Sequence, residues 1–164
     1  MKYTTTHTIC YSPTRTSAEV AAHVARGTAP ERIVETDLTC DRDTRPIRIG
    51  NELAVIAAPV YAGRIAPVAR ERFSRLQGEG TPAILLAVYG NRDYEDALIE
   101  LRDLAVSRGF VPLAAGAFIG EHSYSRPGMP VAEGRPDRSD LAAAESFGRQ
   151  AAEKLASVSS PADL

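Results

Sequence analysis

Two continuous apolar runs in the middle of the chain constrain its fold most strongly. Leu53–Ala58 reads Leu-Ala-Val-Ile-Ala-Ala, and Ala83–Tyr89 is almost as apolar from end to end. Runs of this length without polar alternation are typical of strands that are covered on both faces, as in parallel sheets. Helical patterns separate the strand-like runs along the chain. This alternation predicts an α/β fold in which a parallel sheet lies between two layers of helices.

The other elements follow the same alternation. We expect strands over residues 4–11, 31–38, 53–58, 83–89 and 111–119, and helices over residues 16–26, 67–76, 94–105 and about 137–157. The segment Thr39–Gly50 is broken by Pro46 and poor in apolar residues, so we expect it to be mostly loop. Since no linker or repeat interrupts the pattern, we interpret residues 1–164 as a single domain.

Composition excludes several classes of protein. A formal net charge of −2 gives no reason to expect nucleic acid or an anionic membrane as a partner. Two cysteines are too few for a disulfide framework or a four-cysteine metal site, so no metal is predicted. No apolar run approaches the roughly 18 residues of a membrane span, and the chain starts without a signal-peptide pattern. We therefore expect a cytoplasmic protein.

A hydroxyl-rich turn between the first expected strand and helix has the features of an anion site. The first backbone N–H groups of a helix have no partner within the helix, and the helix dipole is positive at this end. Serine and threonine hydroxyls can donate further hydrogen bonds. The turn therefore predicts a phosphate site with these candidate ligands: Ser12, Thr14, Arg15, Thr16 and Ser17.

Two further loops follow the third and fourth expected strands. Pro59–Arg64 and Tyr89–Tyr94 contain tyrosines, which can stack on a flat ring, and glycines, which let backbone approach it closely. If the strands are ordered 2-1-3-4-5, these loops and the hydroxyl-rich turn meet at the carboxyl end of the sheet. The three loops together predict a site for a phosphorylated ligand with a flat ring.

Four segments carry a resemblance to a known family. Tyr11–Ser17 resembles the phosphate loop of flavodoxins. Pro59–Ile65, Val88–Tyr94 and Gly120–Ser125 are similar to the flavodoxin-like domains that are often fused to a four-iron–four-sulfur ferredoxin. The resemblance implies a flavodoxin-like three-layer α/β/α sandwich with a five-stranded parallel sheet of order 2-1-3-4-5. The cysteine pattern of the ferredoxin half is absent, so the chain is expected to carry no cluster.

The resemblance implies noncovalent binding of FMN. The hydroxyl-rich turn would hold the phosphate, with Arg15 either paired to it or pointing into solvent. The residues expected on the two sides of the isoalloxazine ring are Pro59, Val60, Tyr61, Ala62, Gly63 and Arg64 on one, and Tyr89, Gly90, Asn91 and Tyr94 on the other. His122 either touches this site or is a hydrogen-bonded loop residue.

The expected function is electron transfer through FMN, either as an electron carrier or as a small FMN-dependent reductase. No residue is singled out as catalytic, and the expected partners are redox proteins such as a separate ferredoxin or reductase, with the chain a monomer or homodimer. A different class of function is a low-molecular-weight phosphatase that uses Cys10 and Arg15. The spacing Cys-x4-Arg is one residue short of that motif, and its late Asp-Pro is missing.

Overall fold

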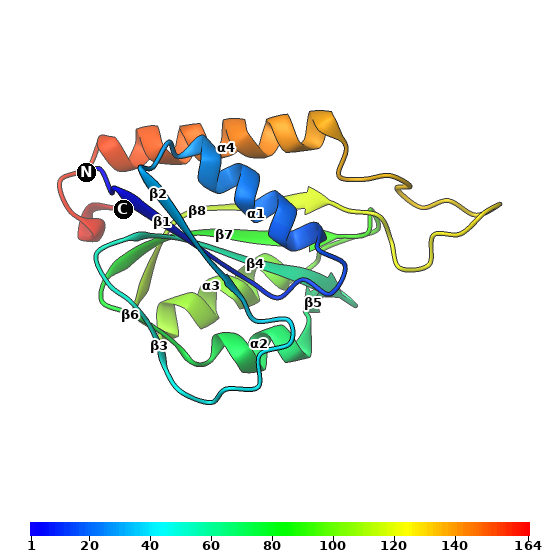
Figure 1. Cartoon of the computed structure of the whole chain (residues 1–164), viewed down its shortest axis with the longest axis horizontal. Coiled ribbons are helices and arrows are strands. Elements are labelled where there is room, and N and C mark those ends of the chain that lie inside the picture. The colour runs from blue at the N-terminus through cyan, green and yellow to red at the C-terminus, as the bar shows by residue number, and fades with distance from the viewer.

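Five parallel strands form the central sheet of the computed structural model, which describes residues 1–164 (Figure 1). They are β1 (Thr5–Cys10), β2 (Arg32–Asp37), β4 (Leu53–Tyr61), β7 (Thr81–Tyr89) and β8 (Phe110–Ile119). Their order across the sheet is β2-β1-β4-β7-β8, and every neighbouring pair is parallel. This is the predicted order 2-1-3-4-5, so the α/β fold class is confirmed.

Helices cover both faces of this sheet. Helices α1 (Thr16–Gly27) and α4 (Arg138–Ala156) lie on one face, and α2 (Pro67–Phe73) and α3 (Ala97–Ser107) lie on the other (Figure 1). A short 3-10 helix, η1 (Pro161–Asp163), ends the chain. Helix α4 begins where the sequence predicts, because Asp137 caps it by accepting hydrogen bonds from the amides of Ser139 and Asp140. No helix has both the length and the apolar character needed to cross a membrane.

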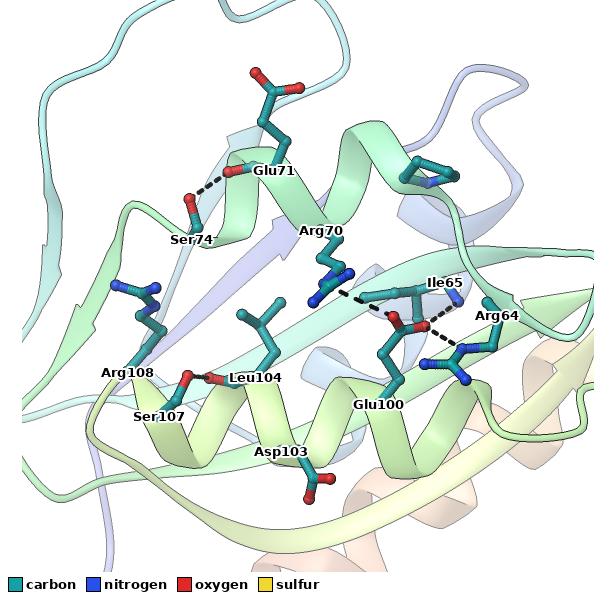
Figure 2. A pocket seen from close by; sticks show the side chains of 11 residues that line it. Arg64, Ile65, Arg70, Glu71, Ser74, Glu100, Asp103, Leu104, Ser107 and Arg108 are labelled. Atoms are coloured by element: carbon teal, nitrogen blue, oxygen red, sulfur yellow. Dashed lines mark hydrogen bonds and ion pairs between the residues drawn. The ribbon is translucent and has the colours of Figure 1, made fainter.

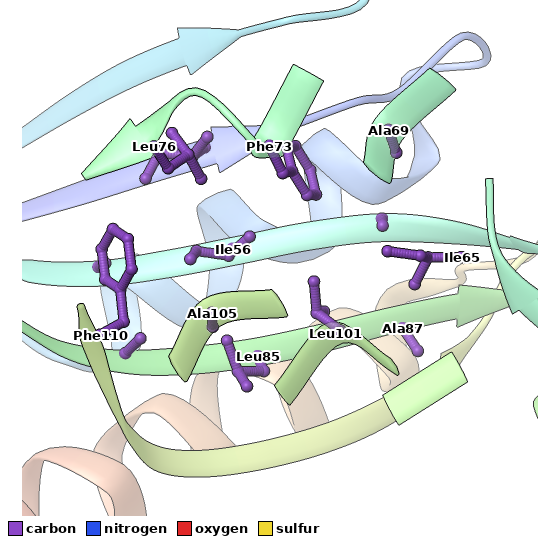
Figure 3. Close-up of a cluster of buried hydrophobic side chains, with 14 of the residues drawn as sticks. Ile56, Ile65, Ala69, Phe73, Leu76, Leu85, Ala87, Leu101, Ala105 and Phe110 are labelled. Atoms are coloured by element: carbon purple, nitrogen blue, oxygen red, sulfur yellow. The ribbon is translucent and has the colours of Figure 1, made fainter. Parts of the chain in front are cut away.

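The two apolar runs are apolar because alternate residues face two separate cores. On the α2 and α3 side, Ile56 and Leu85 pack with Phe73 and Leu101 (Figure 3). The intervening residues of the same strands belong to a second cluster with helices α1 and α4; this cluster includes Val55, Ile84, Leu86, Val20, Val24 and Leu155. Burial on both faces explains why Leu53–Ala58 of β4 and Ala83–Val88 of β7 carry no polar side chain.

Two short strands account for most of the differences between the predicted and the observed elements. Strands β3 (Ile47–Ile49) and β6 (Leu76–Gly78) form a separate two-stranded parallel sheet. The expected loop 39–50 therefore contains a strand. The expected helix 67–76 ends at Phe73 because Leu76 pairs with Ile47. The third long helix begins at Ala97, three residues later than expected.

Helices α1 and α4 cross at very short distance. A Cβ atom added to Gly148 would lie 2.1 Å from the Val24 carbonyl oxygen, and one added to Gly27 would lie 2.1 Å from the Glu145 carbonyl oxygen. Next to the crossing, His23 Nδ1 lies 2.9 Å from Glu145 Oε1. Only glycine at both positions allows the two helix backbones to approach this closely.

Candidate functional site

A cleft of about 510 Å³ opens at the carboxyl ends of β1, β4, β7 and β8. Its walls come from four loops that are far apart in the sequence. Of the residues predicted for the site, it brings together Ser12, Thr14, Thr16, Ser17, Pro59, Val60, Tyr61, Ala62, Tyr89 and Gly90. Five others, Arg15, Gly63, Arg64, Asn91 and Tyr94, do not line it.

The loop between β1 and α1 is held from within. Buried Ser12 donates its amide to Thr39 Oγ1 over 2.8 Å, and its Oγ accepts from the Ala18 amide over 3.0 Å. Its carbonyl oxygen accepts from the Arg15 amide over 3.0 Å. These bonds leave the amides of Thr14, Thr16 and Ser17 without a partner in the chain. Three free amides at the N-terminus of a twelve-residue helix can bind an anion.

Arg15 points away from the cleft. Its backbone is left-handed, with φ of 68°, and its guanidinium Nη1 lies 3.1 Å from Asp37 Oδ2 at the end of β2. The side chain is 72% exposed. The sequence left open whether Arg15 pairs with a bound phosphate or points into solvent. In the structure Arg15 points into solvent.

The segment predicted as the second loop is a tight hairpin. Strand β4 continues through Pro59 to Tyr61, and β5 (Arg64–Ile65) pairs with it antiparallel. Ala62 and Gly63 make the turn with φ of 50° and 75°, as a two-residue turn of this twist requires. Tyr61 lies on the cleft side and is 49% exposed. Burial and the nearby Tyr11 raise the pKa of the Tyr61 phenol, so the phenol is neutral at physiological pH.

Glu100 of α3 fixes this hairpin in place, as Figure 2 shows. Its Oε2 accepts from Arg64 Nε over 3.1 Å and from the Ile65 amide over 3.0 Å, and its Oε1 lies 3.8 Å from Arg70 Nε. These groups line a separate groove of about 910 Å³ between α2 and α3. The turn is also bonded to the start of α3, since Gly63 O accepts from the Asp96 amide. Arg64 therefore anchors the turn from outside the cleft.

Replacing Glu100 with glutamine should destabilise the protein by about 1 kcal/mol at neutral pH, since the arginine partners are half-exposed. Burial alone would raise the pKa of Glu100. The hydrogen bonds from Arg64 and the Ile65 amide and the positive charges of Arg64 and Arg70 together outweigh burial, so the pKa is lower than the ordinary 4.5. A carboxyl group with a lowered pKa stabilises the fold at pH values above 4.5. This stabilisation is lost as the pH falls through the pKa that Glu100 has in the folded protein. Urea denaturation at several pH values should thus show the two proteins converging in acid. Glu71→Gln, an exposed change in the same groove, should have no such effect.

Tyrosines gather at this end of the sheet. Five of the six in the chain follow or end its strands: Tyr11, Tyr61, Tyr89, Tyr94 and Tyr124. The rings of Tyr89 and Tyr94 meet edge to face with centroids 5.4 Å apart. Tyr94 thus supports Tyr89 from behind the cleft wall, because Tyr89 lines the cleft and Tyr94 does not.

The loop after β8 supplies wall residues that were not among the predicted ligands, including Gly120, Glu121, His122 and Tyr124. Gly120 passes so close to Thr16 that an added Cβ would lie 2.7 Å from Thr16 Cγ2. His122 packs on Gly90, where an added Cβ would lie 2.4 Å from His122 Cδ2. The similarity of Gly120–Ser125 to a flavodoxin-like segment was the sequence signal for this wall. Val88 and Arg92, which line the cleft from β7 and the loop after it, belong to the segment Val88–Tyr94 that carried the same similarity.

His122 has a defined orientation in this wall. Its Nδ1 accepts a hydrogen bond from the Tyr124 amide over 3.0 Å, and its ring lies 4.8 Å from the Tyr124 ring. An accepting Nδ1 leaves Nε2 to carry the proton of the neutral imidazole. His122 is thus both a hydrogen-bonded loop residue and a cleft residue.

Cys10 lacks the surroundings of a reactive thiol. Its side chain is buried in the cluster that faces α1 and α4. Burial, followed by the negative charges of Asp37 and Glu35, raises the pKa of the thiol to about 12 despite the nearby Arg15. A thiol with this pKa is protonated at neutral pH, and only the thiolate is nucleophilic.

No known protein family and no curated protein matches the chain in sequence. Solved structures do match its fold. The apo form of an NADH:FMN oxidoreductase (EMOB) is 17% identical with a TM-score of 0.64, over 98% of this chain and 93% of that one. The two-electron reduced flavodoxin of Megasphaera elsdenii is 12% identical with a TM-score of 0.57, over 90% and 98%. A flavodoxin from the domain Archaea is 10% identical with a TM-score of 0.58, over 93% and 99%. The chain therefore has the flavodoxin fold.

Proposed function

We propose that the cleft binds FMN noncovalently and that the protein transfers electrons through it. The observation that carries this proposal is the set of free amides of Thr14, Thr16 and Ser17, which belong to one wall of an aromatic-lined cleft. Backbone amides at a helix N-terminus are well suited to a phosphate dianion. The phosphate would be held by amides and hydroxyls, without Arg15.

The rest of the cleft fits the flat ring of a flavin. Tyr61 and Tyr89 offer aromatic surface, and Pro59 and Val60 offer apolar surface on the same wall. Ala62 and Gly90 present backbone with little or no side chain to hold a ring away. A volume of about 510 Å³ is in the range of cofactor sites.

A bound flavin supplies the electron chemistry, and the protein supplies binding, orientation and electrostatics. The hairpin turn at Ala62 and Gly63 is fixed to α3 by the Asp96 amide and by Glu100, so its backbone groups are held in position. A carrier needs nothing more from the chain. A separate ferredoxin or reductase would be its partner.

A small FMN-dependent reductase is the second candidate. His122 favours it, because an oriented imidazole in the cleft wall can exchange a proton with a substrate. The neutral, buried Cys10 thiol counts against the phosphatase alternative. The variant His122→Gln separates the two FMN functions. If the protein is a reductase, its rate of NAD(P)H oxidation should fall in this variant. If it is a carrier, its rate of electron exchange with a redox protein should be unchanged.

Purified protein should be yellow and should release FMN on denaturation, as identified by its visible spectrum and mass. FMN at about a hundred times its Kd should raise the free energy of unfolding by about 2.7 kcal/mol. Riboflavin, which has the ring but no phosphate, is the matched control and should stabilise the protein much less. A colourless protein that FMN does not stabilise would contradict the proposal.

A further inference from the structure

Thr39, in the loop between β2 and β3, holds the hydroxyl-rich turn from outside the cleft. Its Oγ1 accepts a hydrogen bond from the Ser12 amide over 2.8 Å. No residue of the loop from 38 to 46 lines the cleft. Thr39 therefore contacts the turn that carries the three free amides without contacting the space that a ligand would occupy.

This contact joins Ser12 to a part of the chain outside the turn. Buried Ser12 makes two other hydrogen bonds, in which its Oγ accepts from the Ala18 amide and its carbonyl oxygen accepts from the Arg15 amide. Both of these partners belong to the turn or to α1, so they would move together with Ser12. A buried amide that loses its partner is costly, and the hydroxyl of Thr39 therefore fixes where the Ser12 amide points.

The carboxylate of Asp37, the last residue of β2, orients Thr39 and also contacts the turn. Its Oδ1 accepts from the Thr39 amide over 2.8 Å, and its Oδ2 lies 3.1 Å from Arg15 Nη1. The turn is thus bonded to the end of β2 at two points, at Ser12 through Thr39 and at Arg15 through Asp37. Two points of attachment fix the orientation of the turn better than one does.

Helix α2 fixes Thr39 as well. Arg72 of this helix donates from Nη1 to the carbonyl oxygens of Leu38 and Thr39. Its guanidinium also lies over the ring of Tyr11, 5.5 Å from the ring centroid. Because Tyr11 directly precedes Ser12, these contacts form a closed circuit that runs from the turn through Thr39 and Arg72 back to the turn. Arg72 does not line the cleft either.

We propose that Thr39, held by Asp37 and Arg72, is a positioning residue for the phosphate of FMN. This inference rests on the proposed function. The three free amides of the turn can bind one phosphate together only if they keep their relative positions, and donors that are already in position need no ordering when the ligand arrives. Without the Thr39 hydroxyl, Ser12 would lose its attachment outside the turn, and part of the binding free energy would be spent on ordering the turn.

Thr39→Val tests this proposal, because valine keeps the branched shape of threonine and removes the hydroxyl. The Kd for riboflavin divided by the Kd for FMN measures what the phosphate contributes to binding. We expect this ratio to fall about tenfold in Thr39→Val, as for the loss of one hydrogen bond, while the Kd for riboflavin stays that of the wild type. Thr39→Ser keeps the hydroxyl and should retain the wild-type ratio. Arg72→Met should lower the ratio by less than Thr39→Val does, since it leaves the hydroxyl in place.

Thr36→Val is the matched control. It makes the same substitution in β2 and removes the hydrogen bond between Thr36 Oγ1 and His7 Nε2, which are 2.7 Å apart, but Thr36 contacts neither the turn nor the cleft. Its ratio should equal that of the wild type, and circular dichroism checks that each variant is folded. A wild-type ratio in Thr39→Val would overturn the inference and leave the proposed function standing. A wild type in which the phosphate adds nothing to binding would overturn both.

Discussion

Replacing Gly148 with alanine should destabilise the protein by about 3 kcal/mol, the upper range for overpacking a core. An added Cβ would lie 2.1 Å from the Val24 carbonyl oxygen and 3.0 Å from its carbon. Both are backbone atoms in the last turn of α1, so relief requires the two helices to move apart. In a free helix the same change would stabilise by about 1 kcal/mol, so the packing reverses the usual sign.

Denaturant titration with a spectroscopic probe measures this effect. Gly50→Ala is the matched control, because no atom lies within 4 Å of its added Cβ and its φ is not positive. We expect this control to change the free energy of unfolding by less than about 0.5 kcal/mol. If Gly148→Ala were as stable as the wild type, α1 and α4 could not cross as closely as the structure shows.

Replacing Thr16 with aspartate should weaken FMN binding about 100-fold while leaving the fold at least as stable. Thr16 is the first residue of α1 and lines the cleft, and its amide is one of the three free donors. At the intermediate effective dielectric constant of a protein surface, a carboxylate at this position repels a nearby phosphate by about 3 kcal/mol. The same carboxylate stabilises the helix by about 0.3–1 kcal/mol through the helix dipole. Affinity and stability should therefore change in opposite directions.

Titration calorimetry and thermal unfolding together check this prediction. Thr44→Asp, an exposed change in the loop between β2 and β3, has the same effect on net charge and should leave FMN affinity unchanged. Riboflavin binding should survive in Thr16→Asp because it has no phosphate to repel. Equal FMN affinity in Thr16→Asp and the wild type would place the phosphate elsewhere.

The central sheet could be predicted from the sequence because its signals are local. Ile56 and Val55 face different cores, so every position of the run is apolar, and no other element produces that pattern at that length. The signal for the hydroxyl-rich turn was equally local, because it lies within one short stretch of sequence. Strands β3 and β6 escaped prediction because each is three residues long and exists only through pairing with the other.

The orientation of site residues could not be predicted because contacts between distant segments set it. Arg15 turns away from the cleft because Asp37 lies at the end of the neighbouring strand. Arg64 turns outward because Glu100 lies behind the hairpin. His122 enters the cleft wall because Gly90 leaves room for its ring. In each case the partner lies more than 20 residues away in the chain.

The gathering of tyrosines around the cleft gives the protein its own optical probe. The chain contains no tryptophan, so its ultraviolet emission comes from tyrosine alone. Five of its six tyrosines lie at the carboxyl end of the sheet, and only Tyr3 lies before β1 at the opposite end. A ligand that absorbs where tyrosine emits, as a flavin does, should quench most of this fluorescence on binding. Occupancy of the cleft can therefore be followed in the unlabelled wild-type protein.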